Sequence, residues 1–289
     1  MAKKINIFQI DAFTDKPFKG NQAAVCFADE LTSKEKQVIA NEMNLAETAF
    51  ISKSKEADYN LKWFTPTTEV ELCGHGTIAS LHFLKEKNKI KENSQITFET
   101  LSGILKCKYE NGKYFMQIPI FKMEEFIGDK QEVLNALKIN PKKENGIIPF
   151  ILLENKNLYI YVKTLETLKS IFPDFNELVR ITKEKKEFSG IAVFTLETVD
   201  KKNSAHLRYF APYYGIDEDI VTGSANGPLL LVLKKLGLIE DKTEEISLTF
   251  EQGDFKNRPG RVGATYSESS NELYISGKAV TVLKGDLFF

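Results

Sequence analysis

The first half of the chain places apolar residues at alternate positions in short runs, a pattern typical of strands with one buried face. One stretch follows helical spacing instead: Thr32 or Ser33 can cap its N-terminus, and Asn44 can end it. Strands are predicted on both sides of this helix. They cover residues 4–10, 23–27, 48–51, 59–64, 95–100, 103–107 and 114–118.

The second half of the chain repeats the order of features in the first half. Trp63-Phe64-Thr65-Pro66 is echoed by Tyr209-Phe210-Ala211-Pro212, and each is followed by an acidic segment and a turn of small residues. The turns are Cys73-Gly74-His75-Gly76 and Thr222-Gly223-Ser224-Ala225-Asn226-Gly227. The step from the proline to the glycine is eight positions in the first copy and eleven in the second, which indicates a three-residue insertion.

Each turn opens an apolar segment, residues 78–84 and 229–233, that is predicted to be a helix buried on nearly every face. Many strands around one buried helix, found twice, predict two similar α+β lobes produced by an internal duplication. The charged segment from residue 121 to residue 145 makes the best boundary. We therefore expect an N-terminal lobe over 1–122 and a C-terminal lobe over 123–289, with the last strands free to return to the N-terminal lobe.

The composition indicates a globular protein without a strong charge bias. The 289 residues are many for one compact domain, and 42% of them are hydrophobic. The 39 basic and 40 acidic residues leave a net charge of −1, so no global field would attract nucleic acid or an anionic membrane.

Segments that would direct the chain to or across a membrane are not expected. No apolar stretch approaches the ~20 residues needed to span a bilayer. Asn6, Gln9 and Asp11 interrupt the first apolar run, which is unlike a signal peptide. The three cysteines would leave one thiol over in any disulfide framework. We expect a reduced, cytoplasmic protein that acts on a small molecule.

Both glycine-rich helix starts are candidate anion sites, because the first N–H groups of a helix lack partners and the helix dipole is positive there. Two such starts, facing each other across a cleft, would bind a small molecule that carries carboxylate groups. The alternative is that the glycines only allow a strand to turn tightly into a helix. Two turns in matching places favour the binding site.

Glu47 is the candidate proton carrier. It is a lone carboxylate among apolar neighbours between a helix end and a strand, and burial would raise its pKa toward the range of a general acid or base. The alternative is a surface glutamate at a strand edge. The matching stretch of the second half, around Ser189-Gly190, has no carboxylate, so the two lobes would differ chemically.

Two turn residues and one flanking carboxylate are further candidates. His75 lies between glycines at a helix start, where the dipole lowers the pKa of imidazole and favours its neutral form; the alternative is a polar cap. Asp219 would orient a substrate amine or hydroxyl, or cap the second turn, and Ser224 is that turn's hydroxyl donor. His82 is predicted to be a structural core histidine, and His206 a strand residue.

Several standard signatures are missing from the sequence. It has no Walker-type phosphate loop and no Gly-x-Ser-x-Gly elbow. Cys73 and His75 are two positions apart, but three histidines and three cysteines in all argue against a zinc site. Residues 74–79 match a Gly-x-Gly-x-x-Ala dinucleotide pattern, although no apolar strand precedes them. A dinucleotide-dependent oxidoreductase is therefore the weaker alternative.

Short motifs follow one another nearly from end to end of the chain. They are Asp11-Ala12-Phe13-Thr14, Phe18-Lys19-Gly20-Asn21, Asn44-Leu45-Ala46-Glu47-Thr48-Ala49-Phe50, Phe64-Thr65-Pro66, Glu71-Leu72-Cys73-Gly74-His75-Gly76-Thr77, Glu218-Asp219-Ile220-Val221-Thr222-Gly223-Ser224-Ala225, Glu251-Gln252-Gly253 and Arg258-Pro259-Gly260-Arg261. In order and spacing the sequence resembles the PhzF (phenazine-biosynthesis-like) isomerase family, whose fold is similar to that of diaminopimelate epimerase.

The resemblance implies two lobes, each a strand-rich sheet rolled around a central helix, with the active site between them. It also implies a cofactor-free isomerase, a homodimer, that shifts a proton on a small amino- or hydroxy-acid-like substrate. Glu47 matches the catalytic carboxylate, which takes a proton from carbon and returns it elsewhere, and His75 and Asp219 match residues that assist. The residues predicted to bind substrate are Asn21, Gly74, Gly76, Gly223 and Ser224. No metal, nucleic acid or membrane partner is predicted.

Three positions, Gln22, Asn226 and Asn257, depart from the family pattern, in which proline, histidine and glycine are common. Asn226 lies at the second turn and bears on the choice of substrate. Racemisation by one thiol on each side of the cleft is not expected, because Thr222 is the repeat counterpart of Cys73. A third alternative is a binding or regulatory protein on an isomerase fold.

Overall fold

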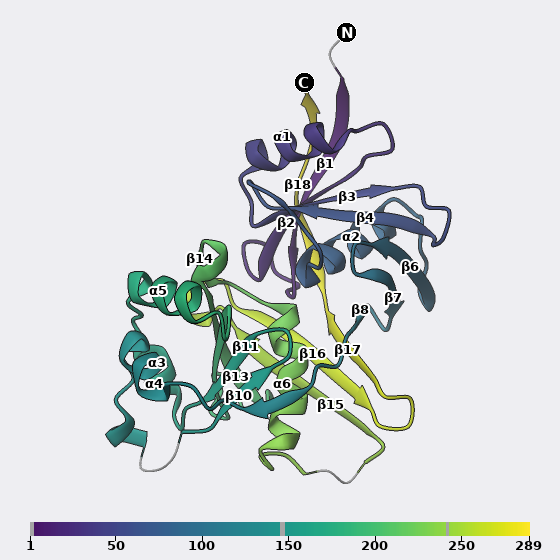
Figure 1. Cartoon of the computed structure of the whole chain (residues 1–289). Helices are drawn as coiled ribbons and strands as arrows, with labels where there is room; N and C mark the ends of the chain where they lie inside the picture. The colour runs from purple at the N-terminus through teal and green to yellow at the C-terminus, as the bar shows by residue number, and fades with distance from the viewer. Residues whose placement is uncertain (1–2, 145–147, 241–242) are drawn as a thin grey trace. The chain divides into compact units, whose positions relative to one another are not determined.

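The computed structural model describes residues 3–144, 148–240 and 243–289, and the chain divides into two compact units. The first unit comprises Met1–Ile118, Gly260–Val262 and Tyr274–Phe289, and the second comprises Pro119–Pro259 and Gly263–Leu273. Each unit combines many strands with one buried central helix (Figure 1), so the predicted α+β class with two similar lobes is confirmed. Residue 145, the end of the expected boundary segment, lies outside the described residues.

The first unit is built mainly of the strands that alternation predicts. They are β1 (Lys4–Ala12), β2 (Asn21–Phe27), β3 (Glu47–Ser52), β4 (Tyr59–Phe64), β5 (Glu69–Val70), β6 (Ser94–Thr100), β7 (Gly103–Glu110), β8 (Lys113–Ile118) and β18 (Ala279–Phe288). β1 lies between β18 and β2 and runs antiparallel to both, so the last strand of the chain pairs with the first. β2 and β3 are parallel, as are β4 and β6.

Two helices complete the first unit, α1 (Ser33–Met43) and α2 (Gly74–Glu86). α1 has the predicted ends: Thr32 and Glu35 form a reciprocal capping box, and Asn44 closes the helix at a positive φ of 48°. α2 buries ten of its thirteen residues against strands that include β1, β2, β3 and β8. In Figure 1 α2 lies among these strands, which explains why its sequence is apolar on nearly every face.

The second unit follows the same plan. Its strands are β9 (Met123–Glu125), β10 (Phe150–Leu153), β11 (Asn157–Tyr161), β12 (Gly190–Thr195), β13 (Ala205–Ala211), β14 (Ile216–Asp219) and β15 (Glu245–Gln252), while β16 (Gly260–Ser267) and β17 (Glu272–Gly277) have residues in both units. Its helices are α3 (Lys130–Leu137), α4 (Leu165–Ser170), α5 (Phe175–Lys185) and α6 (Gly223–Lys235), with short 3-10 turns η1 (Pro141–Glu144), η2 (Pro212–Tyr214) and η3 (Asp254–Lys256). α6 buries ten of its thirteen residues. It is the counterpart of α2.

None of the helices in the described ranges is long and apolar enough to cross a membrane.

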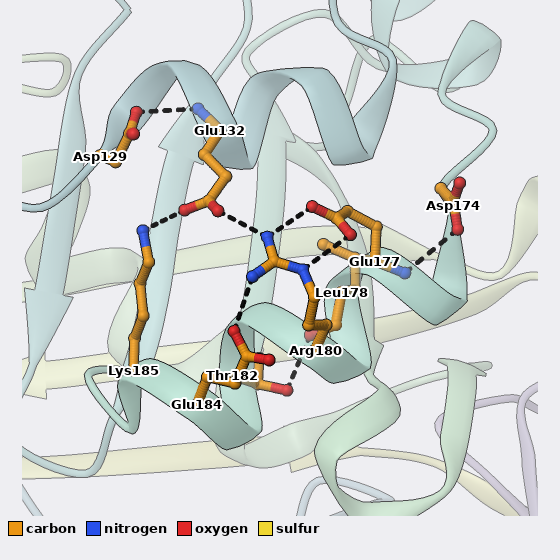
Figure 2. Close-up of polar contacts among 9 residues, drawn as sticks. All are labelled: Asp129, Glu132, Asp174, Glu177, Leu178, Arg180, Thr182, Glu184 and Lys185. Carbon is orange, nitrogen blue, oxygen red and sulfur yellow. Dashed lines mark hydrogen bonds and ion pairs between the residues drawn. The ribbon is translucent and has the colours of Figure 1, made fainter.

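α3 and α5 cover part of the second unit's core and are joined at its surface by charge. Leu137 of α3 and Ile181 of α5 are fully buried in one apolar cluster with strand residues of β11 and β12. Outside it, the Arg180 guanidinium donates to Glu132 across the helix pair and to Glu177 within α5 (Figure 2). Because these groups are exposed to solvent, the apolar contact is the larger source of stability.

The strand registers show that the two units are copies of one arrangement. Trp63 in β4 pairs with Ala49 in β3, and Tyr209 in β13 pairs with Ala192 in β12. The three-residue insertion predicted in the second copy coincides with the region of η2, between β13 and β14. The internal repeat therefore holds in three dimensions as well as in sequence.

The same kind of hydrogen bond is found at the helix start of each copy, within that copy. Thr77 Oγ1 donates to the carbonyl of Cys73 at 2.7 Å, and Asn226 Nδ2 donates to the carbonyl of Thr222 at 2.9 Å. Both donors lie four residues after the helix cap. Asn226, a departure from the family pattern, thus carries out the structural task that Thr77 has in the first copy.

Gly190 is the first residue of β12, and its place in the second copy is the one that Glu47 has in the first. Glu47 pairs with Ala23 across β2 and β3, and Gly190 pairs with Asn157 across β11 and β12. A Cβ on Gly190 would lie 2.1 Å from the Tyr209 hydroxyl and 2.4 Å from Asn157 Oδ1. The hydroxyl–amide contact fills the space that a side chain would need.

Gly190→Ala is therefore expected to lower the free energy of unfolding by about 1–3 kcal/mol through overpacking, measured by denaturant unfolding. Gly285→Ala is the matched control, because the nearest atom to its new Cβ would be 3.7 Å away, an ordinary contact. Equal stability of the Gly190→Ala variant and the wild type would contradict the packing described for β12.

Candidate active site

Glu47 lies at the start of β3, directly after the segment that links α1 to this strand. Only 12% of its side chain is exposed, so the alternative of a surface glutamate does not hold. Glu47 Oε2 lies 2.8 Å from His75 Nε2, and the His75 side chain is 6% exposed. A carboxylate and an imidazole from different elements thus form a buried ion pair.

Two further side chains of the first unit contact the imidazole of His75. The amide of Asn21, the first residue of β2, lies 3.3 Å from Nδ1. Cys73 Sγ lies 3.7 Å from Nδ1 and 3.8 Å from Nε2. The structure therefore brings together Glu47, His75 and Asn21, which the sequence predicted, and adds Cys73.

The pKa of His75 corrects the expectation from the helix dipole. Burial lowers this pKa, but the neighbouring Cys73 and Glu47 favour the charged ring, and the net result is a pKa well above the ordinary value of histidine. Burial and the charge of Glu47 raise the pKa of the Cys73 thiol. The pKa of His75 is therefore shifted upward, the opposite of the direction that the helix dipole predicts, and this favours an ion pair with Glu47.

The first turn of α2 offers backbone donors beside this pair. Cys73 caps the helix: its Sγ accepts from the N–H of Gly76 at 3.2 Å and its carbonyl accepts from the N–H of Thr77 at 3.1 Å. Among the described residues, no acceptor contacts the N–H groups of Gly74 and His75. These two donors and the positive end of the dipole suit an anion.

Gly76 is required by close packing. A Cβ at this position would lie 2.8 Å from Trp63 Cδ1 and 2.9 Å from Cys73 Sγ. Trp63, the single tryptophan of the chain, is 1% exposed and packs against the helix start. Gly76 therefore has a structural role, because it lets the helix backbone come close to the indole, and its role in substrate binding stays a prediction.

In the second unit, the candidates Asp219, Gly223 and Ser224 surround the start of α6. Thr222 is the N-cap, but its side chain does not bond to the helix N–H groups and instead donates to Asp219 Oδ2 at 2.6 Å. Within the described chain, no acceptor contacts the N–H groups of Gly223 and Ser224, and the half-buried hydroxyl of Ser224 has no hydrogen-bond partner. This start thus resembles that of α2 in its open donors.

The two helix starts differ in the groups that carry charge. Val70 pairs with Trp63 in the first unit, and Asp219 pairs with Tyr209 in the second, so valine takes the place of the aspartate. Counting on from these pairs, Cys73 corresponds to Thr222 and His75 to Ser224. Each unit therefore has one carboxylate that its copy lacks.

Of the two other histidines, His82 has structural surroundings and His206 lies in a strand, as predicted. His82 lies 3.0 Å from the Tyr114 hydroxyl and 3.1 Å from Thr281 Oγ1, and burial lowers its pKa to about 4. His206 is fully buried in β13 and lies 2.9 Å from Glu251.

Two sets of side chains have donor atoms within 4.8 Å of one another: Glu47, Cys73 and His75, and His206, Glu251 and Asp254. Each set is one ligand short of the four in a structural zinc site. In the second set, Glu251 already accepts from His206, from a neighbouring asparagine side chain and from two backbone N–H groups.

The Gly-x-Gly-x-x-Ala stretch does not have the surroundings of a dinucleotide site. It forms the start of α2, as such a motif would, but the strand before it is the two-residue β5. A Rossmann fingerprint follows a long buried parallel strand. The oxidoreductase alternative therefore has no structural support.

Comparison with known proteins agrees with the fold and the motifs. Residues 10–285 match the family model PhzC-PhzF, described as phenazine biosynthesis-like protein. A Clostridium acetobutylicum protein named as an uncharacterized isomerase is 37% identical over 303 residues, covering 99% of both chains. The crystal structure of a Bacillus anthracis phenazine biosynthesis protein of the PhzF family has a TM-score of 0.88 and 32% identity, over 99% of this chain and 100% of the other.

A more distant structure shares the fold alone. It is a hydroxyproline epimerase from Agrobacterium vitis with a TM-score of 0.64 and 11% identity, covering 99% of this chain and 93% of the other. The matching model, the close relatives and the shared architecture lead to one conclusion: this chain belongs to the PhzC-PhzF, phenazine biosynthesis-like family.

Proposed function

We propose that the protein is a cofactor-independent isomerase in which Glu47 takes a proton from one carbon of a small acid and returns it to another. The observation that carries the proposal is the buried 2.8 Å contact between Glu47 and His75 at the start of α2. A general base needs a partner that sets its orientation, and the reaction needs donors for the charge that develops on the substrate. His75 and the open N–H groups of α2 would meet these needs. The isomerase names of the family relatives support the same class.

The proposed reaction balances without another reagent. Glu47 removes a proton from a carbon next to a carbon–carbon double bond, and the electron pair of that C–H bond moves into the unsaturated group. The carboxylic acid of Glu47 then gives the proton to the far end of the same conjugated system. The product is an isomer of the substrate. The His75 imidazolium and the N–H groups of Gly74 and His75 would stabilise the negative charge between the two steps.

We propose an amino- or hydroxy-acid-like substrate. The open N–H groups at each helix start suit a carboxylate, and Asn21 would add an amide beside His75. In the second unit, Asp219 would bind an amine or hydroxyl, with Gly223 and Ser224 as donors. A homodimeric assembly and a cytoplasmic location remain predictions from the sequence.

Proton transfer through Glu47 is expected to exchange a carbon-bound hydrogen of the substrate with solvent. Small unsaturated amino and hydroxy acids would be incubated with the protein in D2O and examined by proton NMR. Glu47→Gln is expected to lower the exchange rate on any active compound by about 10²–10⁴-fold, because the amide cannot accept the proton. Glu56→Gln, in the exposed loop between β3 and β4, is the control. A Glu47→Gln rate within threefold of wild type would exclude Glu47 as the proton carrier.

The charge state of His75 can be measured without a substrate. Because its pKa is raised, both ring nitrogens of His75 are expected to carry protons at neutral pH in ¹⁵N NMR spectra. In Glu47→Gln the opposing effect of burial is no longer balanced by this carboxylate, so the pKa of His75 is expected to fall. His82 serves as the internal reference, since its pKa of about 4 keeps it neutral. A neutral His75 in the wild type would refute the ion pair.

The same ion pair should make stability depend on pH. Folding raises the pKa of His75, so its contribution to the free energy of unfolding is fully present below about pH 6.5 and is lost as the pH rises through the folded pKa. His75→Gln is therefore expected to lose more stability, relative to wild type, at about pH 6 than at about pH 9. Denaturant unfolding of both proteins at the two pH values measures this, and an equal loss at both would contradict it.

A further inference from the structure

Gln252 is the last residue of β15 and is 1% exposed beside the start of α6. We propose that Gln252 is a positioning residue: it fixes the direction of the Thr222 hydroxyl, so that this hydroxyl donates to Asp219. The proposal rests on the proposed function in one respect, namely that Asp219 binds the substrate. The contacts themselves lie within the second unit.

The amide of Gln252 uses all of its hydrogen-bonding capacity at this helix start. Its Oε1 accepts from the backbone N–H of Thr222 at 2.9 Å and from Asn226 Nδ2 at 2.6 Å. Its Nε2 donates to the carbonyl of Asp219 at 2.9 Å and to Thr222 Oγ1 at 3.1 Å. The orientation of the amide follows from these partners, because reversing it would point its donors at the N–H of Thr222.

The contact with Gln252 decides where the Thr222 proton points. A hydroxyl has one proton, and Thr222 Oγ1 already accepts from Gln252, so its own proton is directed at Asp219 Oδ2, 2.6 Å away. A threonine at an N-cap commonly accepts from an N–H of the first turn instead, which Thr222 does not do. A hydroxyl–carboxylate bond of this length belongs to the strong, charge-assisted kind.

The first unit shows which of these contacts the fold itself requires. The bond from Asn226 to Thr222 has its counterpart there in the bond from Thr77 to Cys73, so it belongs to the shared architecture. The bond from Thr222 to the carboxylate of Asp219 has no such counterpart, because Val70 takes the place of the aspartate.

The counterpart of Gln252 in the first unit also separates the contacts of the shared architecture from those specific to Asp219. Glu99 and Glu251 hold equivalent registers against β4 and β13, so the next residues, Thr100 and Gln252, are counterparts. Thr100 Oγ1 donates to the carbonyl of Gly103 within its own hairpin. A glutamine that reaches the helix start is therefore found in the copy whose helix start has a carboxylate to orient.

Other ionisable side chains lie near Asp219. Tyr209 faces it from β13, and burial, Tyr214 and Asp219 together raise the pKa of this phenol, which leaves it neutral at ordinary pH. Glu218, the preceding residue, is paired with Arg208 at 2.8 Å. Lys256 lies farther from Glu218, at 3.8 Å.

The test is an NMR titration of the Asp219 carboxyl carbon in protein labelled with ¹³C-aspartate. Thr222→Val removes the hydroxyl and is expected to raise the pKa of Asp219 by about one unit, since the charged form loses a hydrogen bond. Gln252→Met frees the hydroxyl to turn away and is expected to raise this pKa in the same direction. Thr222→Ser keeps the hydroxyl and should restore the wild-type value.

Thr195→Val is the matched control, because Thr195 is a buried threonine of β12 whose hydroxyl donates to the carbonyl of Lys163. It should leave the pKa of Asp219 unchanged. If Gln252→Met does not fold, a measurement on the wild-type protein still tests the proposal. Its Thr222 hydroxyl proton should exchange slowly with water and show a nuclear Overhauser effect to the side-chain amide protons of Gln252.

An unchanged Asp219 pKa in Gln252→Met, or in Thr222→Val, would overturn the proposal, as would a rapidly exchanging Thr222 hydroxyl. These outcomes do not depend on turnover. A failure of Glu47 as proton carrier would leave them intact, so the two proposals can fail separately.

Discussion

The ion pair of Glu47 and His75 is the constraint on which the site of the first unit depends. Removing a single charge from water is very unfavourable, so each of these buried groups requires the other. The partners come from β3 and α2, which means that the strand and the helix start must hold a fixed relation. Gly76 helps to fix the position of the helix start, because the absence of a side chain lets the helix backbone approach Trp63. The position of the helix start therefore holds the imidazole of His75 at a defined distance from the Glu47 carboxylate.

Duplication has kept the backbone of the two units and changed the chemistry at matching positions. The carboxylate of Glu47 corresponds to Gly190, where the Tyr209 hydroxyl fills the space, and Asp219 corresponds to Val70. A symmetric arrangement would give two identical acid–base groups, as two-thiol racemisation needs. Here one unit holds a carboxylate beside an imidazole, and the other holds a carboxylate bonded to a hydroxyl. The asymmetry therefore lies in the side chains and not in the strand registers.

Sequence patterns predicted those features that local chemistry controls. Strand alternation, the cap at Thr32 and the apolar runs placed the elements, and the lone carboxylate at Glu47 identified the candidate base. The direction of the pKa shift of His75 was predicted wrongly, because it depends in part on a group from a separate element. The helix dipole acts on His75 within α2, whereas Glu47 arrives from β3, 28 positions earlier in the chain. The contacts of Gln252 with α6 were beyond prediction for the same reason, although the glutamine stood in a recognised motif.

The starts of α2 and α6 contain residues that disfavour a helix, and this explains how one element can provide both stability and chemistry. Glycine costs roughly 1 kcal/mol in a helix interior, and Pro228 cannot donate to the carbonyl of Ser224. These helices must therefore form through burial of their later, leucine-rich turns. Since stability comes from those turns, the first turn is free to keep open N–H groups and close backbone approaches. The candidate site residues His75 and Ser224 lie in this first turn.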